Sequence, residues 1–235
     1  SFVQCDATDG EDLAELIGEN NTVVSLSRPE FLTSLLQRKP TISRLIAIGS
    51  TRVYTRFPDE KCSRLAAMSQ AVWMQDIPST ILHPTMIYGA PGLNNIERIF
   101  RIAKLSPLIP LPSDGSALIQ PVHVNNVVAC IEASLINPET IGRTIVVAGM
   151  HAVTYREFIE TCVEISESKC RVISLPYFLV SLIGLLTHLV PGIPTVTQNE
   201  IRRLQEDKSF DITDLEERLG VRPYPLREGL KLAIN

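Results

Sequence analysis

Hydroxyl and phenol side chains follow two apolar runs of this sequence, where they could take part in proton transfer. Ser50 and Thr51 come directly after the run 45–49, Tyr54 follows shortly after, and Tyr88 ends the run 86–88. Such groups can donate or accept a proton beside a reacting carbonyl or alcohol when a neighbour adjusts their pKa. Two other interpretations stay open. Ser50 and Thr51 could be turn residues at a strand end, and Tyr88 could be an amphipathic pocket wall.

Other kinds of catalytic site are not indicated. Ser50 does not lie in the Gly-x-Ser-x-Gly turn that holds the nucleophile of many hydrolases. Ser50 with His83 or His123 therefore does not predict a nucleophile and its base. His83 precedes a proline inside an apolar run, and both histidines are interpreted as core imidazoles. No group of His, Cys, Asp or Glu has the spacing of metal ligands, so we expect no metal site.

The elements that must position these residues alternate between strand and helix patterns. The stretch 81–92 starts as an apolar strand, is interrupted at His83-Pro84, and leaves through Ala90-Pro91-Gly92. Strands that are apolar on both faces and alternate with helices indicate a parallel sheet covered on both sides. The expected strands are 1–6, 22–26, 45–50, 79–82, 118–124, 144–148 and 171–175. The expected helices are 8–19, 30–38, 64–75, 95–105, 125–135, 158–166, 200–206 and 211–220, and 107–115 is expected to be a loop.

These patterns predict an α/β fold: a Rossmann-like parallel sheet with helices on both faces and a small C-terminal substrate lobe. We expect residues 1–88 and 118–148 to form the nucleotide-binding part. Residues 89–117 and 149–235 would form the smaller lobe. Ligands of open α/β sheets bind outside the carboxyl ends of the strands, which is where Ser50, Thr51 and the stretch 81–92 are expected.

Composition narrows the class of protein. The net charge of -4 and the pI of about 5.6 argue against nucleic acid as a partner. Five scattered cysteines without a Cys-x-x-Cys pair are typical of reduced thiols, and no signal peptide is recognised, so we expect a cytoplasmic protein. Residues 172–190 carry no charge but contain a proline and a glycine. They predict a buried or interfacial helix rather than a membrane span, and if exposed they could contact a membrane or a protein partner.

The order of motifs resembles the extended short-chain dehydrogenase/reductase superfamily, in its nucleotide-sugar epimerase-like and atypical branches. Residues 3–6 resemble the strand whose final Asp contacts adenine, and 22–27 the strand that lines the nicotinamide ribose. Residues 45–51 resemble the strand that ends in the catalytic Ser/Thr pair. Residues 82–89 resemble the Arg-Pro-Thr-x-Ile-Tyr-Gly segment beside the nicotinamide, and 120–127 and 207–211 match later motifs.

Departures from the superfamily pattern concern phosphate binding and catalysis. The opening strand, the Gly-x-x-Gly-x-x-Gly turn and the helix that hold the pyrophosphate are missing from this sequence, and we expect them to lie upstream of Ser1. The catalytic Tyr and the Lys four residues later are replaced by Cys62 and Ala66. Tyr54 or Tyr88 could substitute as the acid, though neither has a lysine at that spacing. His83 replaces an Arg and Asn126 an Asp.

The resemblance implies an NAD(P)-dependent epimerase, dehydratase or reductase-like protein for a nucleotide-sugar or related carbonyl or alcohol substrate. The alternative is a non-catalytic dinucleotide-binding, scaffold or assembly protein of the same fold. The implied catalytic residues are Ser50, Thr51 and Tyr54. The residues implied to bind NAD or NADP are Asp6, Leu26, Ser27, Ser50, His83, Pro84, Met86 and Tyr88. The sequence does not indicate the oligomeric state.

Overall fold

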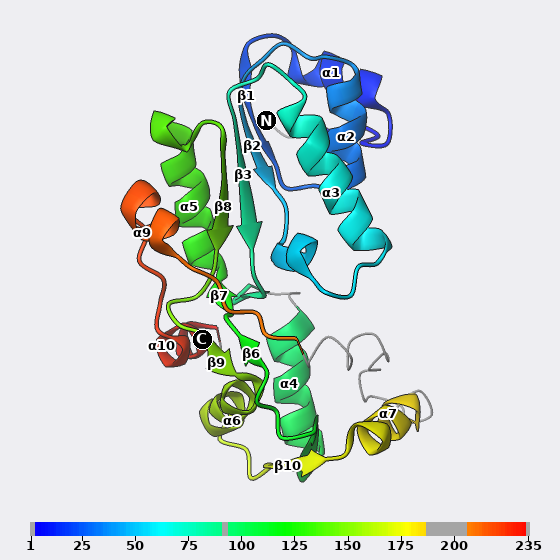
Figure 1. Ribbon diagram of the computed structural model, residues 1–235, viewed down its shortest axis with the longest axis vertical. Helices are drawn as coiled ribbons and strands as arrows, with labels where there is room; N and C mark the ends of the chain where they lie inside the picture. The colour runs from blue at the N-terminus through cyan, green and yellow to red at the C-terminus, as the bar shows by residue number, and fades with distance from the viewer. Residues whose placement is uncertain (1–2, 91–93, 187–205, 234–235) are drawn as a thin grey trace. The chain divides into compact units, whose positions relative to one another are not determined.

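The computed structural model describes residues 3–90, 94–186 and 206–233, and its chain divides into two compact units (Figure 1). The first unit contains residues 1–85, 126–147 and 211–222, and the second contains 86–125, 148–210 and 223–235. Residues 86–88, 118–125, 148 and 211–222 therefore fall on the other side of this division from the ranges expected from the sequence. Residues 211–222 belong to the first unit because the side chains of Leu215 and Leu219 are buried where this segment packs on a strand of the sheet.

The first unit is built on a parallel sheet, as the apolar strand patterns predict. Its strand order is β1-β2-β3-β8, and neighbouring strands are parallel throughout. The strands are β1 (Asn21–Ser25), β2 (Ile42–Ile48), β3 (Ser79–Pro84) and β8 (Arg143–Val147). Every residue of β3 is buried, because this strand has a neighbour on each edge and helices on both faces.

Helices cover both faces of this sheet (Figure 1). One face carries α1 (Gly10–Ile17), α2 (Pro29–Gln37) and α3 (Glu60–Trp73), and the other carries α5 (Val124–Ile136) and α9 (Thr213–Leu219). Two short 3-10 helices, η1 (Thr51–Tyr54) and η2 (Pro138–Thr140), follow β2 and α5. The core between the sheet and the first group is aliphatic, with Leu36, Leu45, Met68 and Ile81 almost fully buried. The predicted α/β fold with a covered parallel sheet is thereby confirmed.

The second unit combines helices with two-stranded sheets. Its strand pairs are β4 (Ile87–Tyr88) with β7 (Val122–His123), β5 (Leu108–Pro112) with β10 (Arg171–Leu175), and β6 (Leu118–Ile119) with β9 (Val153–Thr154). Its helices are α4 (Asn94–Leu105), α6 (Tyr155–Ile165), α7 (Tyr177–Leu186) and α10 (Leu226–Leu232). Thr154 is the N-cap of α6, because its hydroxyl accepts the Glu157 N–H at 3.0 Å.

Three expected elements are wrong. Val3–Asp6 form no strand, because Asp6 starts a turn and no described strand lies beside these residues. The expected loop 107–115 contains β5, whose two prolines are tolerated in a two-stranded sheet with free edges. The strand that was expected to stop at Leu82 runs on to Pro84. This proline is accommodated because β2 has already ended beside Leu82, so no neighbour needs its missing N–H.

Smaller differences concern boundaries. The expected strand 118–124 is split into β6 and β7, and α5 begins at Val124, one residue before the expected helix 125–135. The expected helix 200–206 lies almost wholly outside the described residues. Within the described part of the chain, no helix combines the length and apolarity needed to cross a bilayer.

Candidate functional site

The carboxyl ends of β1, β2 and β3 bring most of the sequence-predicted site residues to one edge of the sheet. The register pairs Ser25 with Ala47, and Ala47 with Ile81. Because the strands are parallel, the residues two positions further along, Ser27, Gly49 and His83, follow side by side at this edge. The three strand ends are therefore neighbours, as the order of motifs predicts.

Gly49 allows the imidazole of His83 to approach the backbone at the end of β2. A Cβ atom on Gly49 would lie 2.3 Å from His83 Nδ1 and 2.5 Å from Cε1. Those distances are far below van der Waals contact, so no larger residue fits without moving the ring. A strand end was predicted here, but no role was assigned to Gly49. The feature that could have indicated its role is a glycine directly after an apolar run.

His83 is a buried, neutral imidazole. His83 is 2% exposed, and none of the described residues forms a hydrogen bond with its Nδ1 atom. Burial lowers the pKa of His83 from 6.5 to about 4, so the ring carries no charge near neutral pH. The interpretation as a core imidazole therefore fits its burial, but the unsatisfied Nδ1 departs from the usual pattern of paired buried groups.

Ser50 and Thr51 use their hydroxyls to shape the turn after β2. Ser50 Oγ accepts the Arg52 N–H at 3.2 Å and caps η1, and Thr51 Oγ1 donates to the Pro84 carbonyl at 3.3 Å. Arg52 in turn forms an ion pair with Asp59, which starts α3. Both hydroxyls are therefore engaged with backbone groups at the sheet edge. These hydrogen bonds support the interpretation of Ser50 and Thr51 as turn residues. Their contact with a ligand remains a prediction.

Tyr54 has the wrong electrostatic setting for an acid catalyst. Its ring packs edge-on against His83, with 5.7 Å between ring centroids. Partial burial raises the pKa of Tyr54 above its usual value of 10, whereas catalysis by a phenolate requires a lower pKa. The position four residues later is Pro58, which brings no cation. Tyr54 is thus brought to the predicted edge with a pKa that is raised rather than lowered.

Cys62 and Ala66 lie on α3, at the positions where the motif order expects Tyr and Lys. Cys62 is in the first turn, where Asp59 Oδ1 accepts its N–H, and its thiol is 3.9 Å from the Val53 carbonyl. Ala66 is exposed on the same helix. Neither residue supplies a phenol or an ammonium group.

The end of β1 offers an apolar surface at the same edge. Leu26 is 69% exposed directly after the strand, which is unusual for a large aliphatic side chain beside a buried sheet. The hydroxyls of Ser25 and Ser27 are 3.4 Å apart. An exposed leucine with two hydroxyl groups is a suitable surface for a ligand that has both an apolar ring and polar substituents.

Asp6 lies in a turn rather than at a strand end. Its carboxylate accepts both the N–H and the hydroxyl of Thr8, at 2.9 Å and 2.7 Å, and these hydrogen bonds lower the pKa of the exposed Asp6. The cap of α1 is Asp9, not Asp6. Asp6 therefore has a local structural role, and its contact with adenine remains a prediction.

Met86 and Tyr88 belong to the second unit. Met86 packs against its core, and Tyr88 is almost completely buried in it. Burial raises the pKa of Tyr88 strongly, and its hydroxyl lies against Gly229, where a Cβ atom would be only 2.1 Å away. Tyr88 therefore has a core position in this unit, which favours neither an acid role nor a pocket wall.

His123 packs between two tyrosines in the second unit. The ring centroids of His123 are 5.3 Å from Tyr88 and 5.4 Å from Tyr224, both edge-on. His123 Nδ1 accepts the Asn125 N–H at 3.1 Å, and its Nε2 is buried without a described partner. Burial lowers the pKa of His123, which agrees with its interpretation as a core imidazole.

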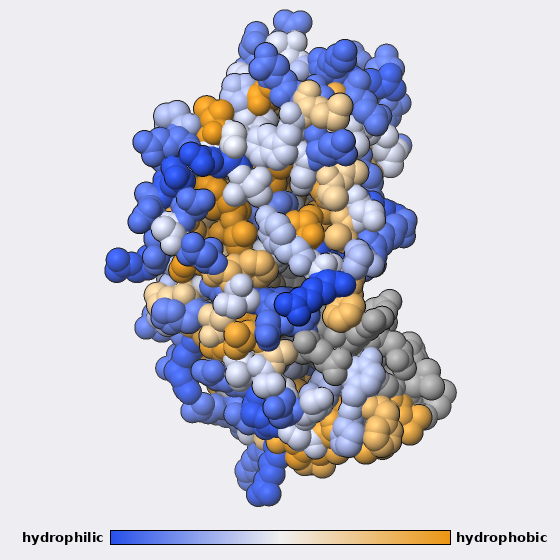
Figure 2. Space-filling model, in the orientation of Figure 1, coloured by the Kyte–Doolittle hydropathy of each residue, from blue (hydrophilic) through white to orange (hydrophobic). Residues whose placement is uncertain are grey.

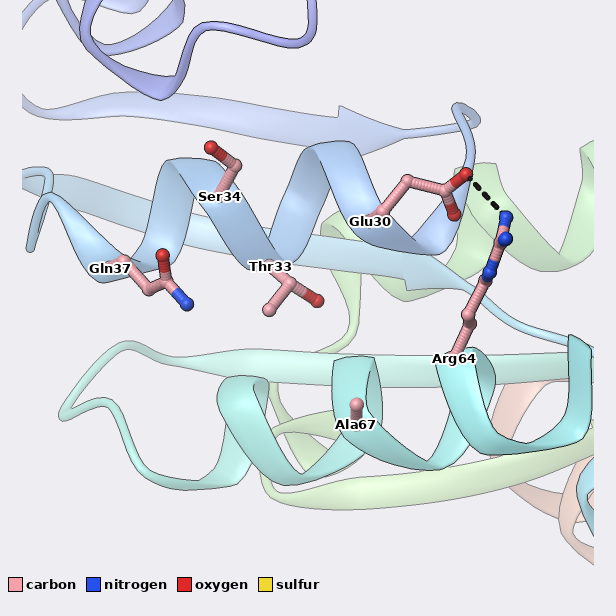
Figure 3. Close-up of a pocket in the computed structure, with 6 residues that line it drawn as sticks. All are labelled: Glu30, Thr33, Ser34, Gln37, Arg64 and Ala67. Atoms are coloured by element: carbon pink, nitrogen blue, oxygen red, sulfur yellow. Dashed lines mark hydrogen bonds and ion pairs between the residues drawn. The ribbon is translucent and has the colours of Figure 1, made fainter. Parts of the chain in front are cut away.

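A hollow of about 200 Å³ lies elsewhere in the first unit, between α2 and α3 (Figure 3). Arg64 and Glu30 form an ion pair across it at 3.1 Å. Its lining residues are Glu30, Thr33, Ser34, Gln37, Arg64 and Ala67. None of them is a predicted site residue. In the described part of the chain, no three His, Cys, Asp or Glu residues gather as metal ligands.

Proteins similar in sequence include a subunit of an NADH dehydrogenase and a hydroxysteroid dehydrogenase/decarboxylase. No family model matches the chain. It is 26% identical over 246 residues to the mitochondrial NADH dehydrogenase [ubiquinone] 1 alpha subcomplex subunit 9 of Rattus norvegicus, a match that covers 96% of this chain and 64% of the rat protein. It is 24% identical over 171 residues to 3beta-hydroxysteroid-dehydrogenase/decarboxylase isoform 2 of Arabidopsis thaliana, covering 66% of this chain and 30% of that enzyme. The chain thus spans less than two thirds of the length of these relatives.

Solved structures share the fold. UDP-glucose 4-epimerase of Thermotoga maritima, solved with UDP-glucose, matches 99% of this chain and 82% of its own with a TM-score of 0.75 and 14% identity. UDP-glucuronic acid 4-epimerase of Bacillus cereus, solved with NAD, matches 99% and 77% with a TM-score of 0.74 and 15% identity. These matches confirm the fold, and the likeness in sequence to the extended short-chain dehydrogenase/reductase superfamily rests on the motif order and the relatives above.

Proposed function

We propose that the protein binds NAD or NADP at the carboxyl ends of β1, β2 and β3. The observation that carries this proposal is the alignment of three strand ends, which puts Leu26–Ser27, Ser50–Thr51 and His83–Pro84 at one sheet edge. This is the edge at which open parallel sheets bind ligands. The Bacillus cereus epimerase of the same fold was solved with NAD, and a further structural neighbour, from Pseudomonas aeruginosa, with NADPH.

The residues of the first unit suit a dinucleotide in part. The exposed Leu26 provides an apolar surface for a ring, and the hydroxyls of Ser27 and Ser50 can accept or donate hydrogen bonds. Asp6 is proposed to approach the adenine. Met86 and Tyr88, which the resemblance also implies, lie in the other unit and carry no weight here. A bound nicotinamide would supply hydride transfer, and this chain's residues would hold and orient it.

The proposed substrate is a nucleotide-sugar or a related carbonyl or alcohol compound. Support comes from the epimerase neighbours and from the Arabidopsis dehydrogenase/decarboxylase.

The scattered cysteines, all free in the structure, support a cytoplasmic location. Localisation of the tagged full-length protein by microscopy would test that part of the proposal.

A second candidate function is dinucleotide binding without catalysis, in a scaffold or assembly protein. The specific observation in its favour is Tyr54, whose pKa is raised and whose neighbour four positions on is Pro58. The replacement of Tyr and Lys by Cys62 and Ala66 points the same way. The similarity to a protein named as a subunit of an NADH dehydrogenase subcomplex supports a role in an assembly.

Activity assays on the full-length protein separate these candidates. The oxidised cofactor is mixed with a panel of nucleotide-sugars and the reduced cofactor with carbonyl compounds, and both the redox state of the cofactor and the epimerisation of the sugar are followed. If Tyr54 is the acid, Tyr54→Phe lowers kcat at least tenfold while the cofactor still binds. Turnover that survives both Tyr54→Phe and Tyr88→Phe would remove these two candidate acids, and saturable cofactor binding with no turnover would favour the non-catalytic function.

A further inference from the structure

Basic and apolar side chains gather where α4 ends and where β5 and β10 begin. Lys104 and Leu105 lie in the last turn of α4 and Arg101 lies just before it, and all three are exposed. The Ser168 hydroxyl donates to the Ala103 carbonyl at 2.5 Å and ties this turn to the segment before β10.

The start of β10 adds two further cations to the same place. Lys169 and Arg171 are exposed, and Arg171 is the register partner of Leu108, the exposed first residue of β5. The Arg171 N–H donates to the Pro107 carbonyl at 2.9 Å. We call residues 101–108 and 167–171 the basic turn.

The charge of the basic turn is opposite to that of the whole protein. It contains four cations and one carboxylate, Glu167, in a chain whose net charge is -4. Within the described residues none of the four cations forms an ion pair, whereas Arg64, Arg156 and Arg227 elsewhere are paired with carboxylates. Unpaired cations around exposed leucines are available to an external anionic surface.

An uncharged helix continues the same side of the second unit. β10 leads into α7, which packs against β5, and Figure 1 places the end of α4, β10 and α7 along one edge of this unit. Phe178 is 67% exposed and Leu182, one turn later, is 52% exposed. Figure 2 shows apolar side chains gathered over α7. Residues 172–190 contain no charged side chain at all.

We propose that the basic turn and the Phe178–Leu182 face of α7 form a docking surface for an anionic lipid bilayer. An apolar helix face enters the headgroup boundary, and neighbouring Lys and Arg side chains bind the negative headgroups. The four unpaired cations beside the apolar helix face favour an anionic bilayer over an apolar groove of a protein partner. In such a groove these cations would have no negative groups to compensate them. The surface lies in the second unit and is independent of the cofactor proposal.

Vesicle sedimentation of the full-length protein tests the proposal. We expect binding to vesicles that contain phosphatidylserine and little binding to vesicles of phosphatidylcholine alone. Each basic residue near an anionic surface contributes about a fivefold factor in affinity, so Lys104→Ala with Lys169→Ala should weaken binding roughly 30-fold. Phe178→Ser with Leu182→Ser should weaken it as well, by removing the inserted face.

The matched control removes the same charge from the first unit. Lys61→Ala with Arg143→Ala changes two exposed cations there and should leave vesicle binding unchanged. Circular dichroism of each variant verifies folding. The proposal is overturned if the wild-type protein binds neither vesicle, if both double variants bind like the control, or if Phe178→Ser with Leu182→Ser abolishes a dimer seen by sedimentation without changing vesicle binding.

Discussion

At the scale of single residues, the closest packing at the proposed site is between Gly49 and His83. We predict that Gly49→Ala destabilises the protein by about 1–3 kcal/mol, because its Cβ would overlap the imidazole. Urea unfolding measures the change. In a double-mutant cycle, His83→Ala should remove most of this cost, since the colliding ring is gone. An equal cost of Gly49→Ala with and without the ring would contradict the packing account.

The burial of His83 also predicts a dependence of stability on pH. The pKa of His83 is lowered to about 4 in the folded protein from 6.5, so between these values the unfolded state binds more protons. Stability should therefore fall as the pH is lowered through this range, with a contribution from His83 of about 3 kcal/mol at most. His83→Gln should flatten the profile between roughly pH 6.5 and 4.

The exposed His151 provides the control for this measurement. Thermal unfolding of His151→Gln should follow the wild-type pH profile, whereas that of His83→Gln should not. Identical profiles for all three proteins would show that the burial of His83 does not govern the acid response.

The sequence could predict which residues gather at the sheet edge but not how their polar atoms are used. Ser50 and Thr51 were recognised from the strand before them, because strand ends are visible in apolar patterns. Their bonds to Arg52 and Pro84 depend on η1 and on the extension of β3, which no local pattern encodes. The wall role considered for Tyr88 overlooked its burial, because a tyrosine that fills a core and one that lines a pocket look alike in a sequence.

At the scale of elements, Arg44 joins four segments around β2. Its guanidinium donates to Thr80 Oγ1, Thr140 Oγ1 and the carbonyls of Pro78 and Ser134, so it links β2 and β3 to α5 and η2. We predict that Arg44→Met costs about 2–4 kcal/mol, because several acceptors would lose their partner.

Chemical denaturation would measure this effect, with Arg143→Ala as the control. Arg143 is an exposed cation at the start of β8. Comparable stability of the Arg44 and Arg143 variants would mean that these hydrogen bonds do not hold the elements together.

The contact between β4 and α10 gives a second element-scale prediction. Gly229→Ala should destabilise the second unit by about 1–3 kcal/mol, because its Cβ would overlap the Tyr88 hydroxyl. Tyr88→Phe removes that oxygen and should recover much of the loss in the double variant. If Tyr88→Phe gives no recovery, the hydroxyl is not the obstacle.

Most elements could be predicted because their periodicity is strong. The strand 171–175 was predicted to the residue, and the helices around 30–38 and 95–105 within a residue or so. The predictions were wrong where pairing with a strand distant in the sequence determines whether a segment forms a strand. β5 forms across two prolines because β10 lies beside it, and Val3–Asp6 stay irregular without a described neighbour.

At the scale of the whole molecule, the fold is that of nucleotide-sugar epimerases, while Cys62 and Ala66 stand where the resemblance implies the acid–base pair. The central claim is that the strand ends around Leu26, Ser50 and His83 bind a nicotinamide dinucleotide. This claim is separate from catalysis, since a protein can keep the binding surface after losing the phenol and the ammonium group.

Isothermal titration calorimetry of the full-length protein with NADH and NADPH tests this claim most directly. We predict saturable binding of at least one cofactor, weakened about tenfold or more by Leu26→Asp, which replaces the apolar surface proposed for the ring with a carboxylate of the same charge sign as the cofactor. Met74→Asp, which changes another exposed apolar residue of the same unit, should bind like the wild type. No heat of binding with either cofactor, or equal weakening by both substitutions, would contradict the account.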